Sequence, residues 1–128
     1  MYLLNTNVFF KYLVEPQSLP GNIQIILNDP RNAIFVSAVV PWELAIKHAK
    51  GKLPKGEVSL ASYEQILLKL NMKELAVTGK HAIHAGRLPP IHQDPFDRLI
   101  IAQGLLESLT ILSLDSFFQP YGVAVITR

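Results

Sequence analysis

The chain has 128 residues, of which 49% are hydrophobic and 17% are charged, and its formal net charge is +2. This composition suits one folded domain covering residues 1–128 and excludes a disordered chain. The absence of cysteine excludes disulfides and thiolate metal sites and is compatible with a reducing compartment. Because the sequence has no apolar run near the roughly 20 residues of a membrane helix and no recognisable signal peptide, we expect a cytoplasmic protein without a membrane partner.

The first half of the chain alternates short apolar runs with amphipathic segments. Asn5-Thr6-Asn7 offers capping side chains directly after the first apolar run, and Ser37 does the same after the second. In chain order the patterns predict a strand at 2–4, a helix at 8–13, a helix at 22–27, a strand at 33–36 and a helix at 38–50.

The second half continues this alternation. In chain order we expect a loop at 54–58, a helix at 59–70, a strand at 75–77, a helix at 78–86, a loop at 88–93, a helix from 94, a strand at 109–112, a helical turn at 116–118 and a strand at 123–126. The predicted strands are continuously apolar, which is typical of a parallel sheet covered on both faces. The sequence therefore predicts an α/β domain with three layers, α/β/α, around a mainly parallel sheet of about five strands.

The stretch Asp94-Pro95-Phe96-Asp97-Arg98 stands at the start of a strongly apolar helical run. Asp94 is a favoured N-cap residue, and proline is well tolerated at the first helical position. Asp97 then falls in the first turn, where the backbone N–H groups and the helix dipole favour an anion. A carboxylate at this place can cap the helix, bind a metal ion, or do both.

In parallel sheets, ligands bind beyond the carboxyl ends of the strands. Other polar side chains are predicted at this edge, because they follow predicted strands or open helices. Asn5 follows the first strand, Asp115 follows the fourth, and Glu43 lies in the helix after the second. Together with Asp97, and with Asp94 nearby, they form an all-oxygen set that suits Mg²⁺ or Mn²⁺. Each acid also has a structural interpretation: Asp94 as a cap, Asp115 as a turn residue and Glu43 as a solvated helix residue.

Four stretches of the sequence resemble the PIN-domain family, and specifically its VapC-type toxins. They are Tyr2 to Asn7, Trp42 to Lys47 with Gly51 to Leu53, Asp94 to Gln103, and Leu109 to Asp115. The resemblance implies a magnesium-dependent endoribonuclease that forms dimers and is neutralised by a small antitoxin protein. It places the four family acids at position 5, Glu43, Asp97 and Asp115. Thr6 and Ser113 would add hydroxyl contacts, although Thr6 is equally an N-cap.

The chain departs from the family at one of these positions, where Asn5 replaces the expected aspartate. An asparagine offers a carbonyl oxygen to a metal ion, but it carries no charge and cannot act as a base. We therefore expect little RNA cleavage, whether Asn5 is an introduced substitution or a natural variant. The alternative is a catalytically dead module that binds RNA or an antitoxin. Asn5 also argues against a receiver-like domain, which needs an acid there.

Basic side chains follow Glu43 along the chain. They are Lys47, Lys50, Lys52 and Lys55. These lysines can hold RNA phosphates, and Arg98 can pair with a phosphate or a carboxylate. The structural alternative is that lysines near a helix C-terminus simply complement the helix dipole.

Overall fold

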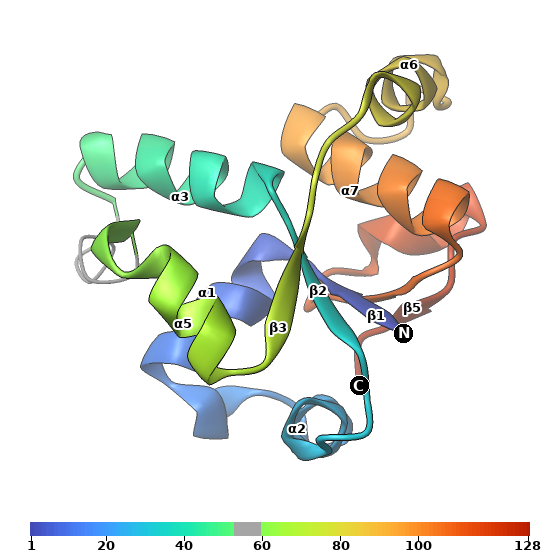
Figure 1. Cartoon of the computed structure of the whole chain (residues 1–128). Coiled ribbons are helices and arrows are strands. Elements are labelled where there is room, and N and C mark those ends of the chain that lie inside the picture. The colour runs from blue at the N-terminus through green and yellow to red at the C-terminus, as the bar shows by residue number, and fades with distance from the viewer. Residues whose placement is uncertain (53–59) are drawn as a thin grey trace.

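A computed structural model describes residues 1–52 and 60–128 of the chain, and Figure 1 shows a central sheet with helices on both sides. Within the described residues the sheet has five strands in the order β3-β2-β1-β4-β5, and all neighbouring pairs are parallel. The strands are β1 (Tyr2–Leu4), β2 (Ile34–Ser37), β3 (Met72–Leu75), β4 (Thr110–Leu112) and β5 (Val125–Ile126). The predicted fold class, a parallel sheet between two helical layers, is confirmed.

The helices connect these strands in the expected alternation. They are α1 (Thr6–Val14), α2 (Gly21–Asn28), α3 (Val39–Ala49), α5 (Tyr63–Lys69), α6 (Gly79–Arg87) and α7 (Pro95–Glu107), with short 3₁₀ helices η1 (Pro16–Ser18) and η2 (Ser116–Tyr121). In Figure 1, α1 and α5 lie on one side of the sheet and α6 and α7 on the other. Within the described part of the chain, none of these helices has the length and apolar character needed to cross a membrane.

Strand β1 lies at the centre of the sheet, between β2 and β4. Leu3 is level with Phe35 on one side and with Ile111 on the other. Because the chain moves outward from β1 to β3 and then returns to β4, the strand order reverses beside β1. In parallel sheets such a reversal opens a crevice at the carboxyl ends of the two strands. Asn5 stands directly at that crevice, where its backbone N–H donates to the Leu112 carbonyl over 2.9 Å.

Two of the predicted strands differ clearly from the structure in their bounds. The third strand covers Met72–Leu75 and not 75–77, because Asn71 adopts a left-handed conformation, with φ at 56°, and turns the chain into the sheet earlier. β3 is an edge strand with Lys73 and Glu74 exposed, so it has no continuous apolar run. The last strand is also shorter than predicted, since Val125 and Ile126 are the two residues of the predicted range 123–126 that are paired with β4.

The predicted helix at 59–70 appears in the structure as α5, Tyr63–Lys69, preceded by a turn at Ser62. Ser59 and the predicted loop at 54–58 lie outside the described residues.

The core packs tightly where α7 crosses the sheet. A Cβ atom added to Gly104 of α7 would lie 2.9 Å from Val123 Cγ2 and 3.0 Å from Ile111 Cδ1. Such distances are shorter than normal van der Waals contact, and Ile111 is completely buried. The absence of a side chain at position 104 is therefore a packing requirement of this helix.

We expect Gly104→Val to destabilise the fold by roughly 2 kcal/mol, because overpacking a dense core forces side chains and backbone to move. Gly86→Val is the matched control, since nothing lies within 4 Å of a Cβ at that exposed position of α6. The free energy of unfolding of both variants, measured in urea, checks the expectation. Equal losses for the two variants would contradict the packing argument.

Candidate active site

The site begins with the start of α7. Asp94 Oδ1 accepts hydrogen bonds from the backbone N–H of Phe96 at 2.8 Å and of Asp97 at 3.2 Å, and Pro95 occupies the first turn. Asp94 is therefore the N-cap of this helix. The cap fixes the first turn of α7, which contains Asp97.

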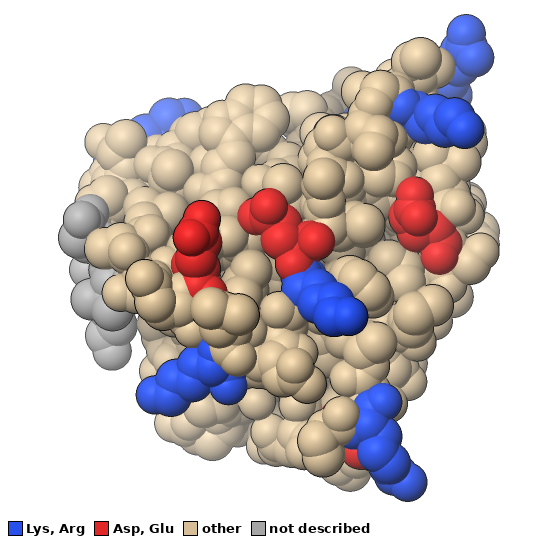
Figure 2. All heavy atoms as spheres, in the orientation of Figure 1, with Lys and Arg blue, Asp and Glu red and all other residues tan. Residues whose placement is uncertain are grey.

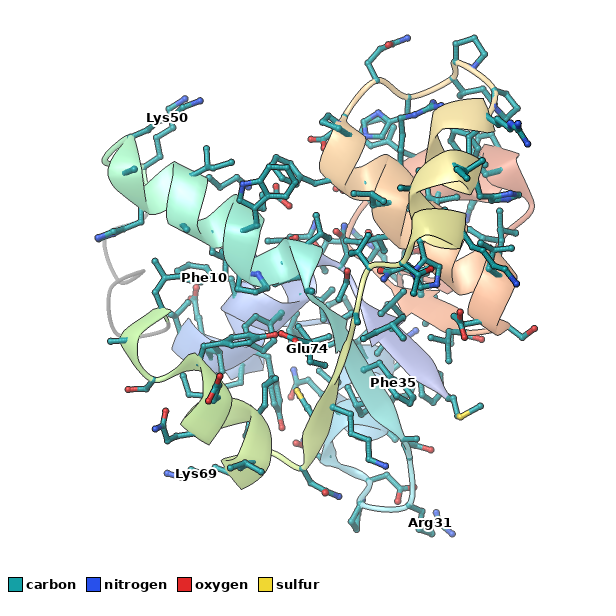
Figure 3. All side chains as sticks on the ribbon, turned by 45° about the horizontal axis from the view of Figure 1, so that its top comes forward. Phe10, Arg31, Phe35, Lys50, Lys69 and Glu74 are labelled. Carbon is teal, nitrogen blue, oxygen red and sulfur yellow. The ribbon has the colours of Figure 1, made fainter. Side chains whose placement is uncertain are left out.

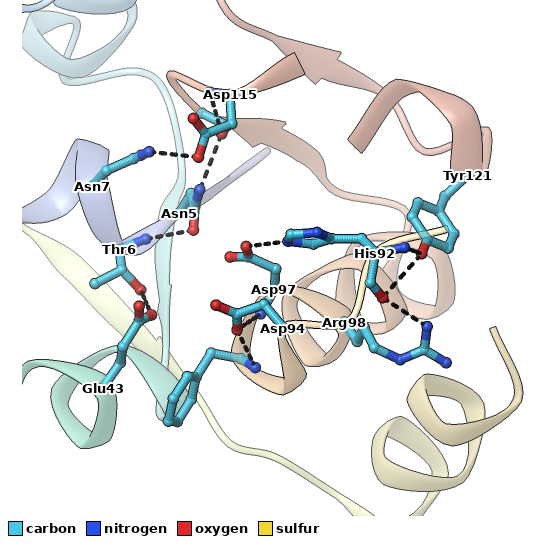
Figure 4. Close-up of polar contacts among 12 residues, drawn as sticks. Asn5, Thr6, Asn7, Glu43, His92, Asp94, Asp97, Arg98, Asp115 and Tyr121 are labelled. Carbon is cyan, nitrogen blue, oxygen red and sulfur yellow. Dashed lines mark hydrogen bonds and ion pairs between the residues drawn. The ribbon is translucent and has the colours of Figure 1, made fainter. Parts of the chain in front are cut away.

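A second group of polar side chains lies at the carboxyl ends of β1 and β4. Asn5 Oδ1 accepts a hydrogen bond from the Thr6 backbone N–H at 2.8 Å, and Asn5 Nδ2 donates to Ser113 Oγ at 3.0 Å. Thr6 Oγ1 donates to Glu43 Oε1 at 2.6 Å, which ties α1 to α3. Ser113 Oγ also accepts from the Asp115 backbone N–H at 3.0 Å. These contacts join residues from distant parts of the sequence, as Figure 4 shows.

We call the six residues at this place the polar cluster. They are Asn5, Thr6, Glu43, Asp97, Ser113 and Asp115. Most of them are buried, with 2% of Asn5, 4% of Thr6, 8% of Glu43 and none of Ser113 exposed. Buried polar side chains persist only when hydrogen bonds orient them, so the cluster has a defined arrangement.

Each acid of the polar cluster has its own partner. Glu43 Oε2 forms an ion pair with Lys47 at 3.0 Å, and Asp115 Oδ2 accepts a hydrogen bond from Asn7 Nδ2 at 3.1 Å. Asn7 Oδ1 is buried and has no hydrogen-bond partner among the described residues. An unpartnered buried oxygen of this kind beside a carboxylate fits a site that completes its contacts with water or a ligand.

The pKa of Asp97 departs from its ordinary value. Burial raises its pKa to about 6, and the charges of Asp94 and Glu43 act in the same direction, against the lowering effect of His92. His92 Nε2 lies 2.7 Å from Asp97 Oδ2. The charge of Glu43 on α3 thus acts on Asp97 at the start of α7.

The chemistry of this donor set fits a hard divalent cation. The amide oxygen of Asn5 and the carboxylates of Glu43, Asp97 and Asp115 are all oxygen donors, which Mg²⁺ and Mn²⁺ prefer. Among residues 1–52 and 60–128, however, no three His, Cys, Asp or Glu side chains already lie together in a metal-binding arrangement. The carboxylates are oriented by their protein partners, and a cation would have to draw them together.

Arg98 lies beside the site but its guanidinium is directed elsewhere. It donates hydrogen bonds of 2.8 to 3.1 Å to four backbone carbonyls, those of Ala85, Leu88, Pro89 and His92. Arg98 thus fixes the segment between α6 and α7.

The described lysines predicted to bind RNA lie at the end of α3 and just after it, where the Lys52 backbone N–H donates to the Lys47 carbonyl at 3.0 Å. Lys47 is paired with Glu43, whereas Figure 3 shows Lys50 at the outer end of α3, away from α7. Lys52 is exposed, and Lys55 lies outside the described residues. Figure 2 shows acidic and basic side chains scattered over one face of the molecule, with no extended basic patch among the described residues there.

Two residues of the site escaped the sequence interpretation. His92 contacts Asp97, and Asn7 contacts Asp115. The only sequence signals are that His92 lies two positions before the Asp94 cap and that Asn7 lies two positions after Asn5. Neither spacing distinguishes a site residue from an ordinary loop or cap residue.

Comparison with known proteins gives a consistent result. The model of the PIN domain family matches residues 2–122. Ribonuclease VapC16 of Mycobacterium tuberculosis is 36% identical over 59 residues, which are 46% of this chain and 42% of that protein. The chain therefore matches less than half the length of this curated relative.

Solved structures with the same fold cover nearly the whole chain. VapBC2 from Rickettsia felis, bound to a DNA fragment from its promoter, has a TM-score of 0.72 at 20% identity, covering 98% of this chain and 96% of that chain. FitAcB from Neisseria gonorrhoeae has a TM-score of 0.68 at 25% identity, with the same two coverages. With the family match over residues 2–122, the sheet order and the polar cluster, the chain belongs to the PIN-domain family.

Proposed function

We propose that the chain is a metal-dependent endoribonuclease of the VapC toxin type, weakened or inactivated by Asn5. The observation that carries this proposal is the polar cluster, in which acids from α3, α7 and the segment after β4 accompany Asn5 at the crevice beside β1. Similarity to Ribonuclease VapC16 over part of the chain supports the same substrate class.

In the proposed mechanism, Glu43, Asp97 and Asp115 would hold Mg²⁺ or Mn²⁺. Such a cation supplies a water of lowered pKa and a counter-charge for the phosphodiester. Thr6 orients the Glu43 carboxylate through its hydroxyl, and Asn7 orients that of Asp115. These contacts orient the Glu43 and Asp115 carboxylates before a cation or RNA arrives.

Asn5 limits this mechanism. Its side chain is an amide, which carries no negative charge and cannot act as a base. The amide oxygen already accepts the Thr6 N–H, and the NH₂ group donates to Ser113. This satisfied amide favours the second candidate function, a catalytically inactive PIN-like module that retains RNA or antitoxin binding.

We also propose a small antitoxin protein as partner and a homodimer as the working form of a single-domain, cytoplasmic protein. Neighbours of the same fold include a toxin–antitoxin complex from Klebsiella pneumoniae. Several large apolar side chains remain exposed on the described surface, and such groups are common at interfaces. They include Trp42, Ile83, Ile91, Leu106 and Phe117.

A cleavage and binding assay separates the two candidate functions. The chain is incubated with end-labelled RNA in Mg²⁺, in Mn²⁺ and in EDTA. Slow cleavage that needs the cation and disappears in Asp97→Asn supports the weakened nuclease. RNA binding that persists in EDTA, without cleavage under any condition, supports the inactive module instead.

A further inference from the structure

His92 is held in place mainly through its backbone. Its N–H donates to the Tyr121 hydroxyl at 2.7 Å, and its carbonyl accepts from Arg98 Nη1 at 3.1 Å. The Tyr121 hydroxyl in turn donates to the Pro89 carbonyl at 3.0 Å. The segment before α7 is thus anchored to α7 and to η2 without using the imidazole ring.

The imidazole ring makes two contacts of its own. One face stacks on Phe117, with ring centroids 5.0 Å apart and an angle of 15° between the planes. Its Nε2 lies 2.7 Å from Asp97 Oδ2, a short distance typical of a hydrogen bond to a charged group. When Asp97 is ionised its carboxylate can only accept, and Nε2 is then the donor in this contact. Figure 4 shows the ring directed at Asp97.

This contact uses one oxygen of Asp97 and leaves the other for a different ligand. No hydrogen bond to Asp97 Oδ1 is recorded among residues 1–52 and 60–128, whereas Oδ2 is bound to His92. The carboxyl group is 15% exposed and the imidazole 22% exposed, so water competes weakly for their contact. A carboxylate held by one oxygen cannot rotate freely about its last side-chain bond.

We propose that His92 is a positioning residue that holds the Asp97 carboxylate in the orientation needed to bind the divalent cation of the polar cluster. This inference rests on the cation site of the proposed function and adds a residue to it. Mutation of a group that hydrogen-bonds to a metal ligand typically lowers the metal affinity about 10- to 100-fold. Without the imidazole, the cation itself would have to order the Asp97 carboxylate, and this cost would lower the affinity for the cation.

Calorimetric titration with Mn²⁺ and Mg²⁺ tests this role, both in the chain as it stands and in the Asn5→Asp variant. We expect His92→Leu to weaken cation binding roughly 10- to 100-fold. His92→Gln should keep the affinity within about threefold, because its amide N–H can reach the position of the imidazole Nε2. His84→Leu is the matched control for loss of a histidine, since His84 lies on α6 away from Asp97 and should bind as the parent does.

Two further variants keep the outcomes distinct. Asp97→Asn should abolish cation binding. If this variant still binds the cation, or if both the chain as it stands and Asn5→Asp fail to bind it, the cation site of the proposed function is wrong. The inference about His92 is then wrong as well. If Asp97→Asn abolishes binding while His92→Leu binds as tightly as the parent or more tightly, the site stands and the role of His92 is overturned. Should His92→Leu fail to fold, Phe117→Ala removes the ring stacking and is expected to weaken binding severalfold; unchanged binding would then overturn the proposal.

Discussion

Asn5→Asp is expected to raise metal-dependent RNA cleavage by at least about 100-fold, the lower end of the effect of a positioned acid or base. The change restores a fourth carboxylate to the polar cluster without altering its shape. An aspartate can still accept the Thr6 N–H, as Asn5 does over 2.8 Å, and can accept a hydrogen bond from the Ser113 hydroxyl.

The measurement is the initial rate of cleavage of a labelled RNA in Mg²⁺ and in Mn²⁺. Asn5→Asp combined with Asp97→Asn is the control for a contaminating nuclease and should be inactive, because it removes an acid that the mechanism needs. Equal rates for the parent and Asn5→Asp, or activity of Asn5→Asp that persists in EDTA, would contradict the assignment of position 5.

Phe118→Ala is expected to lower the free energy of unfolding by about 3–5 kcal/mol, the usual cost of removing a buried phenylalanine ring. Phe118 is completely buried and belongs to the hydrophobic core. It lies in η2, and two other residues of η2, Phe117 and Tyr121, contact His92. Loss of the ring therefore removes core contacts and loosens the helix beside the polar cluster. Denaturant unfolding followed by circular dichroism gives the magnitude.

The neighbouring residue supplies the control for this change. Phe117 is 56% exposed and its ring stacks on His92. Phe117→Ala should cost less than about 1.5 kcal/mol, the range for an aromatic pair at an exposed position. The comparison would go against this account of η2 if the two variants were equally unstable.

The sequence predicts the elements whose signals are local. Asp94 and Pro95 mark the start of α7 because capping and proline preferences act within one turn. The helix predicted at 78–86 likewise begins at a capping residue, Thr78, which forms a capping box with His81 in the structure. Buried central strands such as β1 are continuously apolar, which makes the α/β pattern readable.

Edge elements and contacts between distant segments are harder to predict. Among the described strands β3 has a single neighbour, β2, so Lys73 and Glu74 can face solvent and the pattern of β3 is not that of a buried strand. The four carbonyls bound by Arg98, and the contact of His92 with Asp97, depend on how α6, α7 and η2 pack. No spacing in the sequence encodes such packing.

The residue at position 5 determines how the Ser113 hydroxyl is oriented. In the present chain its oxygen accepts two hydrogen bonds, from Asn5 Nδ2 and from the Asp115 N–H, so its proton points away from position 5. A carboxylate at position 5 can only accept, and the same hydroxyl must then turn its proton toward it. The direction of the hydrogen bond that joins β1 to β4 therefore reverses when the amide at position 5 becomes an acid. Ser113 accepts this hydrogen bond from an asparagine and donates it to an aspartate.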